Sequence, residues 1–386
     1  MRFTICSASN VPCPLPLKFG DSLGYVCNLG SPADIFISDV ITQGNSEHSP
    51  YHCPLSDSFL TIVPNQLKLF SLWLVNSEKL KITFYSLFQD ELYLCTPIRI
   101  SPQSNYYIVG FQPNATMNTA HHMLLYGCSE PGSNESVWSC GEMQSNEVDQ
   151  MYNTASPCRS GSQIVYAWAR DAPSLQLPKD VGFLIGQNSP IKYLVLQVHY
   201  MHRFPEDKRD NSGVFLKYTK RRMPRQAGVI LLGTSGVIPP QRVEHMETAC
   251  TINENKVLHP FAFRTHTHAL GKLVTGYVVR QDENGDVWTL LGKKDPQLPQ
   301  MFYPVVSDKP IERDDVLAAR CIMNNTNNHA VRIGATNKDE MCNFYLMYWV
   351  ENDTPLDQKY CFSVGPPYYY WKRARENLGN IPVSEI

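Results

Sequence analysis

The sequence predicts an all-β protein built from two antiparallel β-sandwiches, and three observations favour this class. Its 386 residues include 28 Pro, 22 Gly, 20 Tyr and 16 Phe, a balance of turn-forming and strand-forming residues. Short apolar runs separated by turn residues recur along the chain, whereas long runs with helical spacing are scarce. The length corresponds to two domains of ordinary size, each able to bury a core of its own.

From about Lys81 onward the strand-like runs follow one another regularly. In the first half they cover residues 92–95, 105–111, 163–169 and 193–200. In the second half they cover residues 228–233, 259–279, 287–291 and 344–350. The basic, proline-containing segment 220–225 between them is the best linker candidate. We therefore expect sandwiches at residues 81–222 and 223–376, followed by a short tail at 377–386.

Residues 1–80 fit this organisation poorly. Pro12, Pro14 and Pro16 interrupt what would be the apolar stretch of a signal peptide. Residues 69–75 are more apolar, but they are internal and too few to span a bilayer, which needs roughly 20. We expect either an unusual leader or, preferably, a start codon assigned too far upstream. The rest of the chain offers no membrane-spanning candidate, so we expect no stable membrane insertion.

Charge and cysteine usage indicate the compartment and exclude some partners. The net charge of −2 does not favour binding to nucleic acid. None of the twelve cysteines forms a C-x-x-C pair, which favours disulfides over zinc ribbons or thioredoxin-like chemistry. Four glycosylation sequons begin at Asn114, Asn134, Asn324 and Asn352. We therefore expect a glycoprotein that is secreted or lies in the lumen of the secretory pathway, including its granules.

Histidines in three places have the pattern of metal ligands. His266 and His268 stand two residues apart in a strand-like run, so their imidazoles would lie on one face. The tandem pair His121 and His122 can bind one metal only if the backbone turns or bulges there. His199 also lies in a strand-like run. A core hydrogen bond would explain His199 equally well, and a solvated loop would explain the tandem pair. The remaining histidines match no ligand pattern and are expected at the surface or in hydrogen bonds: His48, His52, His202, His245, His259 and His329.

The run 339–349 discriminates between possible metals. Strand alternation places Met341, Asn343 and Tyr345 on one face of this run. The methionine can be a core residue that fills a gap. It can instead supply a thioether to the site of His266 and His268, and sulfur with two imidazoles favours copper over zinc or magnesium.

Five motifs, in this order, together closely resemble the peptidylglycine α-hydroxylating monooxygenases, which are copper- and ascorbate-dependent enzymes. The motifs are residues 121–128, 196–200, 264–272, 297–304 and 340–343, and the resemblance runs from about residue 85 to about residue 365. It implies two jelly-roll-like domains, each with one copper ion, that face each other across a solvent-filled cleft. It also implies ascorbate as the reductant, O2 as co-substrate and hydroxylation of the α-carbon of a C-terminal glycine, the first step of peptide amidation, which includes neuropeptide processing.

The resemblance implies a role for individual residues. His121, His122 and His199 would hold the copper that supplies electrons, and His266, His268 and Met341 the copper at which oxygen and peptide react. Arg264, Asn343 and Tyr345 would bind the peptide carboxylate, for which a guanidinium group is suited. Tyr93 and Gln197 match positions near the electron-supplying site.

The resemblance also implies four disulfides: Cys95–Cys140, Cys128–Cys158, Cys250–Cys361 and Cys321–Cys342. It assigns no partner to Cys6, Cys13, Cys27 or Cys53. The family's frequent fifth bridge ends near residues 211–213, where this chain has no cysteine.

Other functions remain in competition. Related enzymes are often fused to a lyase, and nothing after residue 365 is long enough for one, so we expect a monofunctional hydroxylase and a separate peptidylamidoglycolate lyase. The alternatives are hydroxylation of a phenethylamine, as by dopamine β-monooxygenase, and a non-catalytic copper-binding protein. A zinc hydrolase is a more distant possibility, since it would need neither Met341 nor a second three-histidine site.

Overall fold

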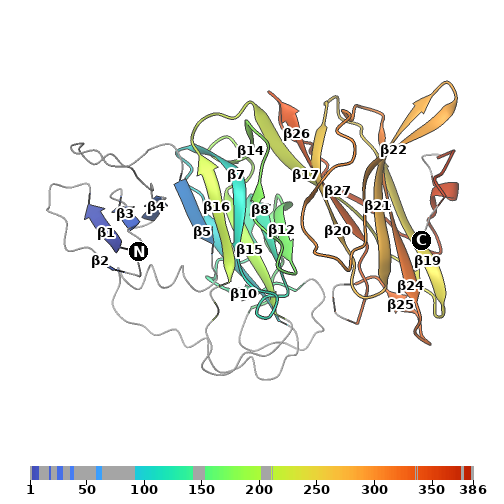
Figure 1. The fold of residues 1–386 in the computed structure, drawn as a ribbon, viewed down its shortest axis with the longest axis horizontal. Helices are drawn as coiled ribbons and strands as arrows, with labels where there is room; N and C mark the ends of the chain where they lie inside the picture. The colour runs from blue at the N-terminus through green and yellow to red at the C-terminus, as the bar shows by residue number, and fades with distance from the viewer. Residues whose placement is uncertain are drawn as a thin grey trace.

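The structure is a computed structural model that describes residues 92–141, 153–200, 210, 212–334, 336, 338–374 and 378–383. Nearer the N-terminus it describes only the backbone of five strands: β1 (Arg2–Ser7), β2 (Leu17–Lys18), β3 (Gly24–Asn28), β4 (Ile35–Ser38) and β5 (Ser58–Ile62). The described residues are almost entirely strands and loops, with one short 3-10 helix, η2 (Trp371–Arg373), and no α-helix (Figure 1). The all-β prediction is confirmed.

The first half of the chain forms two facing sheets. Its strands are β6 (Leu92–Arg99), β7 (Asn105–Asn114), β8 (His122–Cys128), β9 (Glu130–Pro131), β10 (Trp138–Ser139), β11 (Cys158–Ser160), β12 (Gln163–Ala169), β13 (Leu175–Gln176), β14 (Val181–Gly186), β15 (Tyr193–Tyr200) and β16 (Gly213–Thr219). One sheet has the order β10-β6-β15-β8-β12, and its central strand β15 pairs antiparallel with both β6 and β8. The other contains β14, β7 and β16.

The second half forms another pair of sheets. Its strands are β17 (Arg225–Thr234), β18 (Val237–Ile238), β19 (Arg242–Thr251), β20 (His259–His266), β21 (Gly271–Asp282), β22 (Gly285–Lys294), β23 (Tyr303–Pro304), β24 (Val316–Asn325), β25 (Val331–Arg332), β26 (Asn343–Glu351) and β27 (Tyr360–Ser363). The outer sheet has the order β19-β24-β21-β22. The inner sheet contains β23, β20, β26, β17 and β27.

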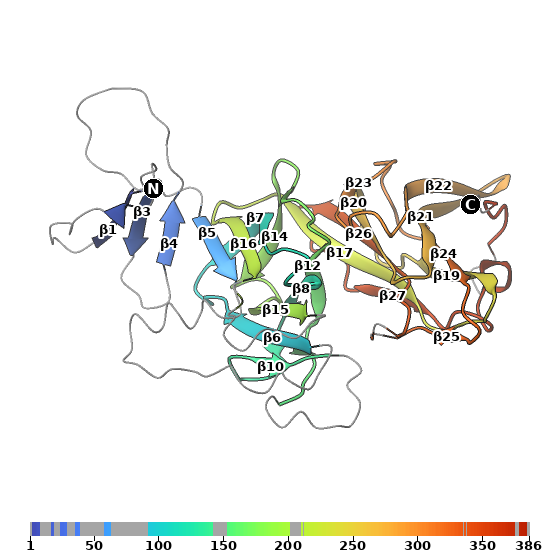
Figure 2. The ribbon, with the colours of Figure 1, turned by 60° about the horizontal axis from the view of Figure 1, so that its bottom comes forward.

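Strand β17 joins the two halves into one sheet. Its first residues, Arg225 and Gln226, pair in parallel with Val181 and Gly182 of β14, and the whole strand pairs antiparallel with β26. In Figure 2 this long strand runs from the first half of the molecule into the second. β17 also pairs in parallel with β27, so the sheets are mixed where the sequence predicted antiparallel pairing throughout. The boundary between the predicted sandwiches is thus a continuous sheet.

The two faces of β26 belong to different cores. Tyr345 and Met347 pack into the core of the first half, and Phe344 and Leu346 pack between the two sheets of the second half. This alternation is the one that the sequence predicts for residues 341–348. The face of the inner sheet that carries Tyr345 is therefore covered by the first half of the molecule.

Several expectations concern residues outside the described part. The environments of His48, His52 and His202 and the side chains of Cys6, Cys13, Cys27 and Cys53 belong to this group. Within the part of the chain that the structure describes, no helix is long and apolar enough to cross a membrane.

Candidate metal centres

The first candidate site is a triangle of three histidine nitrogens. His122 and His199 are paired neighbours on β8 and β15, and His121 lies in a bend immediately before β8. The bend meets the condition that the tandem pair requires, because it frees His121 from strand alternation. The Nδ1 atom of His121 lies 3.3 Å from that of His199 and 3.4 Å from that of His122, and the latter two lie 3.3 Å apart.

This triangle fits one metal ion. Three nitrogens at these separations lie about 1.9 Å from their common centre, close to the roughly 2.0 Å of a metal–imidazole bond. Among the residues described, these histidines form a group of possible ligand atoms that all lie within 4.8 Å of one another. Three nitrogens pointing at one another cannot all be satisfied by hydrogen bonds alone, whereas a shared cation satisfies them together.

Burial keeps the imidazoles of His122 and His199 neutral. Desolvation, reinforced by the neighbouring histidines, lowers the pKa of His199 to about 3. Burial also lowers the pKa of His122 well below its usual value, with further contributions from His199, His266 and other cationic neighbours. Neutral imidazole is the form that binds a metal, so the site is ready to take one at neutral pH.

Tyr93 and Gln197 lie on the strands beside this triangle. The Tyr93 ring stacks on His199 with centroids 4.0 Å apart and an angle of 6° between the planes, so it fixes the orientation of that ligand. Gln197 is buried and donates a hydrogen bond of 3.0 Å from Nε2 to the carbonyl oxygen of Cys140. Gln197 therefore ties the central strand to the Cys95–Cys140 bridge, because its side-chain amide hydrogen-bonds to the carbonyl oxygen and the sulfur of Cys140.

The second candidate site lies at the end of β20. His266 is the last residue of that strand, His268 follows in the loop, and their ring centroids are 5.5 Å apart. Nδ1 of His268 donates to the carbonyl oxygen of Asp339 at 3.0 Å, and Nδ1 of His266 donates to Oε1 of Gln300 at 2.6 Å. Both partners are acceptors, so the proton sits on Nδ1 and the Nε2 lone pair of each ring is left for a metal.

Hydrogen bonds to the Glu340 carboxylate link Met341 to the loop that contains His268. The Glu340 carboxylate accepts hydrogen bonds from the backbone N–H groups of His268, Leu270 and Met341, which joins the loop of His268 to the start of β26. Asn343 Nδ2 lies 3.8 Å from Met341 Sδ. Two imidazole nitrogens with a nearby thioether make a donor set suited to copper that visits Cu(I), as the sequence suggested.

Gln300 and Glu340 were not predicted as site residues, although they lie in the motifs at residues 297–304 and 340–343. Gln300 accepts from His266, and its amide Nε2 donates to the carbonyl oxygens of Thr267 and Pro296. Glu340 is 1% exposed, in spite of its charge. For Glu340 the available signal was a carboxylate directly before the candidate ligand Met341, whereas no local signal marked Gln300.

Arg264 is a buried cation with spare hydrogen-bonding capacity. It lies opposite Tyr345 on β26 and is 2% exposed. Its Nε and Nη2 donate to Gln300, whereas its buried Nη1 has no hydrogen-bond partner among the described residues. The guanidinium carbon lies 5.0 Å from the centre of the Tyr345 ring. A buried guanidinium with an unused donor suits a carboxylate ligand.

The two sites lie close together. The ring centroids of His122 and His266 are 6.1 Å apart, and Tyr166 and Phe302 extend the contact between the halves with ring centroids 6.3 Å apart. His266 is 6% exposed. The predicted solvent-filled cleft between the two sites is therefore not confirmed among the described residues.

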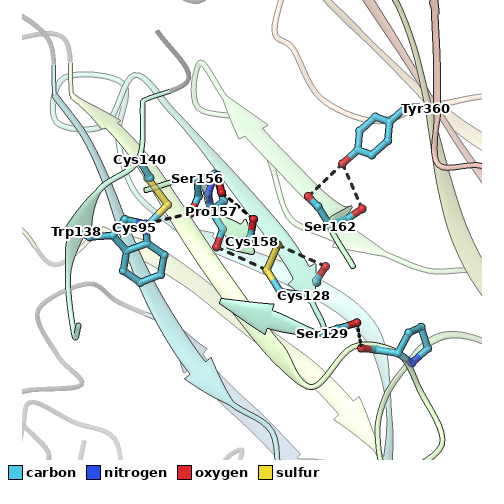
Figure 3. Close-up of a disulfide and its surroundings, with 12 residues drawn as sticks. Cys95, Cys128, Ser129, Trp138, Cys140, Ser156, Pro157, Cys158, Ser162 and Tyr360 are labelled. Atoms are coloured by element: carbon cyan, nitrogen blue, oxygen red, sulfur yellow. Dashed lines mark hydrogen bonds between the residues drawn. A yellow bond between two sulfur atoms is a disulfide. The ribbon is translucent and has the colours of Figure 1, made fainter. Parts of the chain in front are cut away.

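Four disulfides support the two sites. They join Cys95 to Cys140, Cys128 to Cys158, Cys250 to Cys361, and Cys321 to Cys342, which are the four pairs that the resemblance implies. Figure 3 shows the first two beside the histidine-bearing sheet, together with the contact of 3.3 Å between the hydroxyls of Ser162 in the first half and Tyr360 in the second. The bridge to Cys342 fixes the residue next to Met341.

Comparison with known families assigns both halves. Residues 81–207 match the family described as copper type II ascorbate-dependent monooxygenase, N-terminal domain, and residues 225–374 match the C-terminal domain of the same family. The chain therefore belongs to the copper type II ascorbate-dependent monooxygenases. Membership implies copper as the metal, ascorbate as the reductant and O2 as co-substrate, and the donor sets of both sites fit copper.

Individual relatives within this family differ in their similarity to the chain. The chain is 38% identical over 303 residues to peptidyl-glycine alpha-amidating monooxygenase B of Xenopus laevis, covering 76% of this chain and 32% of the relative. It is 39% identical over 302 residues to peptidylglycine alpha-amidating monooxygenase of Rattus norvegicus, covering 77% and 29%. It is 26% identical over 300 residues to dopamine beta-hydroxylase of Homo sapiens, covering 69% and 45%. The chain thus spans about 30% of the length of the amidating relatives.

Proposed function

We propose that this protein hydroxylates the α-carbon of the C-terminal glycine of peptides, with copper, ascorbate and O2. The observation that carries the proposal is the buried Nη1 of Arg264, which has no partner among the described residues and lies beside His266 and Tyr345. A peptide ends in a carboxylate that can accept from this group, whereas a phenethylamine carries a cation that Arg264 would repel. The higher identity to the amidating relatives, 38–39% against 26%, supports the same substrate class.

Each residue of the proposed sites would have a separate task. His121, His122 and His199 would hold one copper ion, and His266, His268 and Met341 would hold the other. When bound, these ions supply the redox chemistry by which ascorbate and O2 bring about the hydroxylation. Residues 81–222 and 223–376 would be the units that carry the two sites.

The substrate would be positioned by the inner sheet. Arg264 would pair with the terminal carboxylate, and Asn343 and Tyr345, on the same face of β26, would orient the glycine. Because Gln300 holds both the guanidinium of Arg264 and the ring of His266, it fixes the distance between carboxylate and metal ligand. Tyr93 would keep the His199 ring in place by stacking.

The proposal also includes a partner enzyme, a cellular compartment and glycosylation. A separate peptidylamidoglycolate lyase would release the amide from the hydroxyglycine product. The four disulfides favour an oxidising compartment, and we place the protein in the secretory lumen or outside the cell. Three of the four sequon asparagines, Asn114, Asn134 and Asn352, are exposed and accessible to glycosylation.

The test is a turnover assay with two substrates in parallel. The copper-loaded protein, with ascorbate and O2, receives a peptide ending in glycine or a phenethylamine, and mass spectrometry follows the products. We expect one added oxygen on the peptide only, and no amide until a lyase is added. Oxidation of the amine alone would assign the dopamine β-monooxygenase activity instead. Two bound copper ions without turnover of either substrate would favour the non-catalytic copper-binding protein.

A further inference from the structure

The inner sheet places an exposed phenylalanine in register with the proposed substrate site. Phe362 of β27 is the partner of Gly233 on β17, Gly233 is the partner of Asn343 on β26, and Asn343 is the partner of His266 on β20. The next row consists of Tyr360, Leu231, Tyr345 and Arg264. Residues paired across adjacent strands point to the same face of a sheet. Phe362 therefore lies on the face that carries the residues proposed to bind the peptide carboxylate.

Solvent exposure falls along this row from Phe362 to His266. Phe362 is 53% exposed, Asn343 is half-buried and His266 is 6% exposed. On the neighbouring row, Arg264 is 2% exposed. A chain whose terminal carboxylate is held by Arg264 thus meets solvent in the direction of Phe362.

Gly233 allows Phe362 to approach Asn343. A Cβ atom placed on Gly233 would lie 2.5 Å from Cε1 of Phe362 and 2.8 Å from Oδ1 of Asn343. The aromatic ring and the amide of Asn343 therefore both lie over the space that the absent side chain leaves. Tyr360 extends the aromatic surface, because its ring centroid lies 6.4 Å from that of Phe362.

An exposed phenylalanine at this position has no evident structural purpose. Apolar side chains exposed singly are common, but Phe362 stands between two other exposed ones at alternate positions, Tyr360 on the same strand and Val364 just after the strand ends. The group is continuous, through the same rows of paired residues, with the buried Arg264 and His266. Such an arrangement suits an apolar side chain that stays near the surface while the terminus beside it is buried.

We propose that Phe362 contacts the side chain of the residue before the C-terminal glycine of a bound peptide, and that it makes the protein select peptides in which this residue is aromatic or aliphatic. The inference rests on the proposed function for the place of the carboxylate. In the strand order β20-β26-β17-β27, Phe362 lies three strand spacings from Arg264, about 14 Å, and its ring covers about one of these spacings by leaning over Gly233. The glycine and the residue before it together span about 7 Å when extended, so a large side chain on that residue can reach the ring. Phe362 is then a specificity-determining residue.

The experiment compares two peptides that differ only in the residue before glycine, Phe or Asn. The copper-loaded wild-type protein and the variant Phe362→Ala are assayed with ascorbate and O2 for kcat/KM on each peptide. We expect the ratio of Phe-Gly to Asn-Gly peptide to fall on the order of fivefold to tenfold in the variant, mainly through KM. Tyr368→Ala is the matched control, an exposed aromatic residue of the following segment, 83% exposed, that belongs to neither row. Phe362→Leu should retain most of the preference, and thermal unfolding checks that each variant is folded.

A binding measurement separates this inference from the proposed function. Equilibrium dialysis of both peptides against the copper-loaded protein without ascorbate gives the affinity ratio in the absence of turnover. If the wild-type protein prefers the Phe-Gly peptide and Phe362→Ala loses the preference, the contact stands even where neither peptide is hydroxylated. If peptides are hydroxylated but the folded variant keeps the wild-type ratio, the proposed function stands and Phe362 is not a specificity residue. Binding without preference in the wild-type protein also overturns the inference.

Discussion

Replacing Glu340 with glutamine tests whether one carboxylate holds the second metal centre together. The two carboxylate oxygens accept different hydrogen bonds. Oε1 accepts from the backbone N–H groups of His268 and Met341, and Oε2 accepts from that of Leu270 at 2.6 Å. In Glu340→Gln the amide oxygen can replace Oε1, but the NH2 group then faces the N–H of Leu270. One hydrogen bond to a charged group is lost and one buried donor is left unsatisfied, which costs about 2–3 kcal/mol. Burial raises the pKa of Glu340, so the cost of desolvating the carboxylate offsets part of the stability that its three hydrogen bonds give the native protein.

Glu340→Ala removes both carboxylate oxygens, and with them the acceptors of all three hydrogen bonds, and should cost roughly 3–6 kcal/mol of the free energy of unfolding. Urea unfolding of the copper-free variants measures these values, and a copper titration measures the second centre, whose affinity should fall about 10–100-fold. The control is Glu312→Gln, because its salt bridge to Arg280 is half-exposed and such pairs contribute about 0–1 kcal/mol. A Glu340→Gln protein as stable as that control would refute the reasoning.

Four further predictions follow from the same contacts. Met341→Ile should abolish turnover and leave the fold and the first copper intact, which copper content and circular dichroism check; near-normal activity would refute the ligand assignment. His199→Ala should reduce bound copper from two ions to one in a dialysis and metal analysis, whereas two retained ions would contradict a site at the histidine triangle. Replacing Cys321 and Cys342 by alanine opens a bridge with a sequence separation of 21, and should lower the free energy of unfolding in urea by about 3 kcal/mol; an unchanged midpoint would contradict this. Arg264→Gln should raise KM for a glycine-terminated peptide about tenfold or more while copper binding persists, and an unchanged KM would contradict its role in binding the carboxylate.

The sequence predicted those parts of the structure that depend on local pattern. Alternation placed Asn343 and Tyr345 on one face of β26, and in the structure Tyr345 packs into the core of the first half while its neighbours Phe344 and Leu346 pack into that of the second. The condition attached to the tandem histidines, a turn in the backbone, is met because β8 begins only at His122. Side-chain direction in a strand has a period of two residues, so such statements follow without knowledge of the fold.

The sequence did not predict contacts that depend on packing between distant segments. Gln300 reaches Arg264 and His266 from a loop more than 30 residues away, and nothing in its neighbourhood specifies those partners. The distance between the two metal centres is a similar case. That distance is set by β17, which pairs with β14 at one end and with β26 along its length. The apolar run at residues 228–233 predicted a strand, but it did not indicate either of these partner strands.

The shared sheet makes the two candidate metal centres parts of one folding unit. Side chains of the second half, including Val229, Leu231 and Met347, complete the apolar core of the first half. Separating the halves would expose these side chains to water, at a cost of about 1.5–3 kcal/mol for each large one. The face that would be exposed is also the one that carries Arg264, Asn343 and Tyr345. We therefore infer that the first half both carries the histidine triangle and covers the sheet face that bears Arg264, Asn343 and Tyr345, the residues proposed to bind substrate.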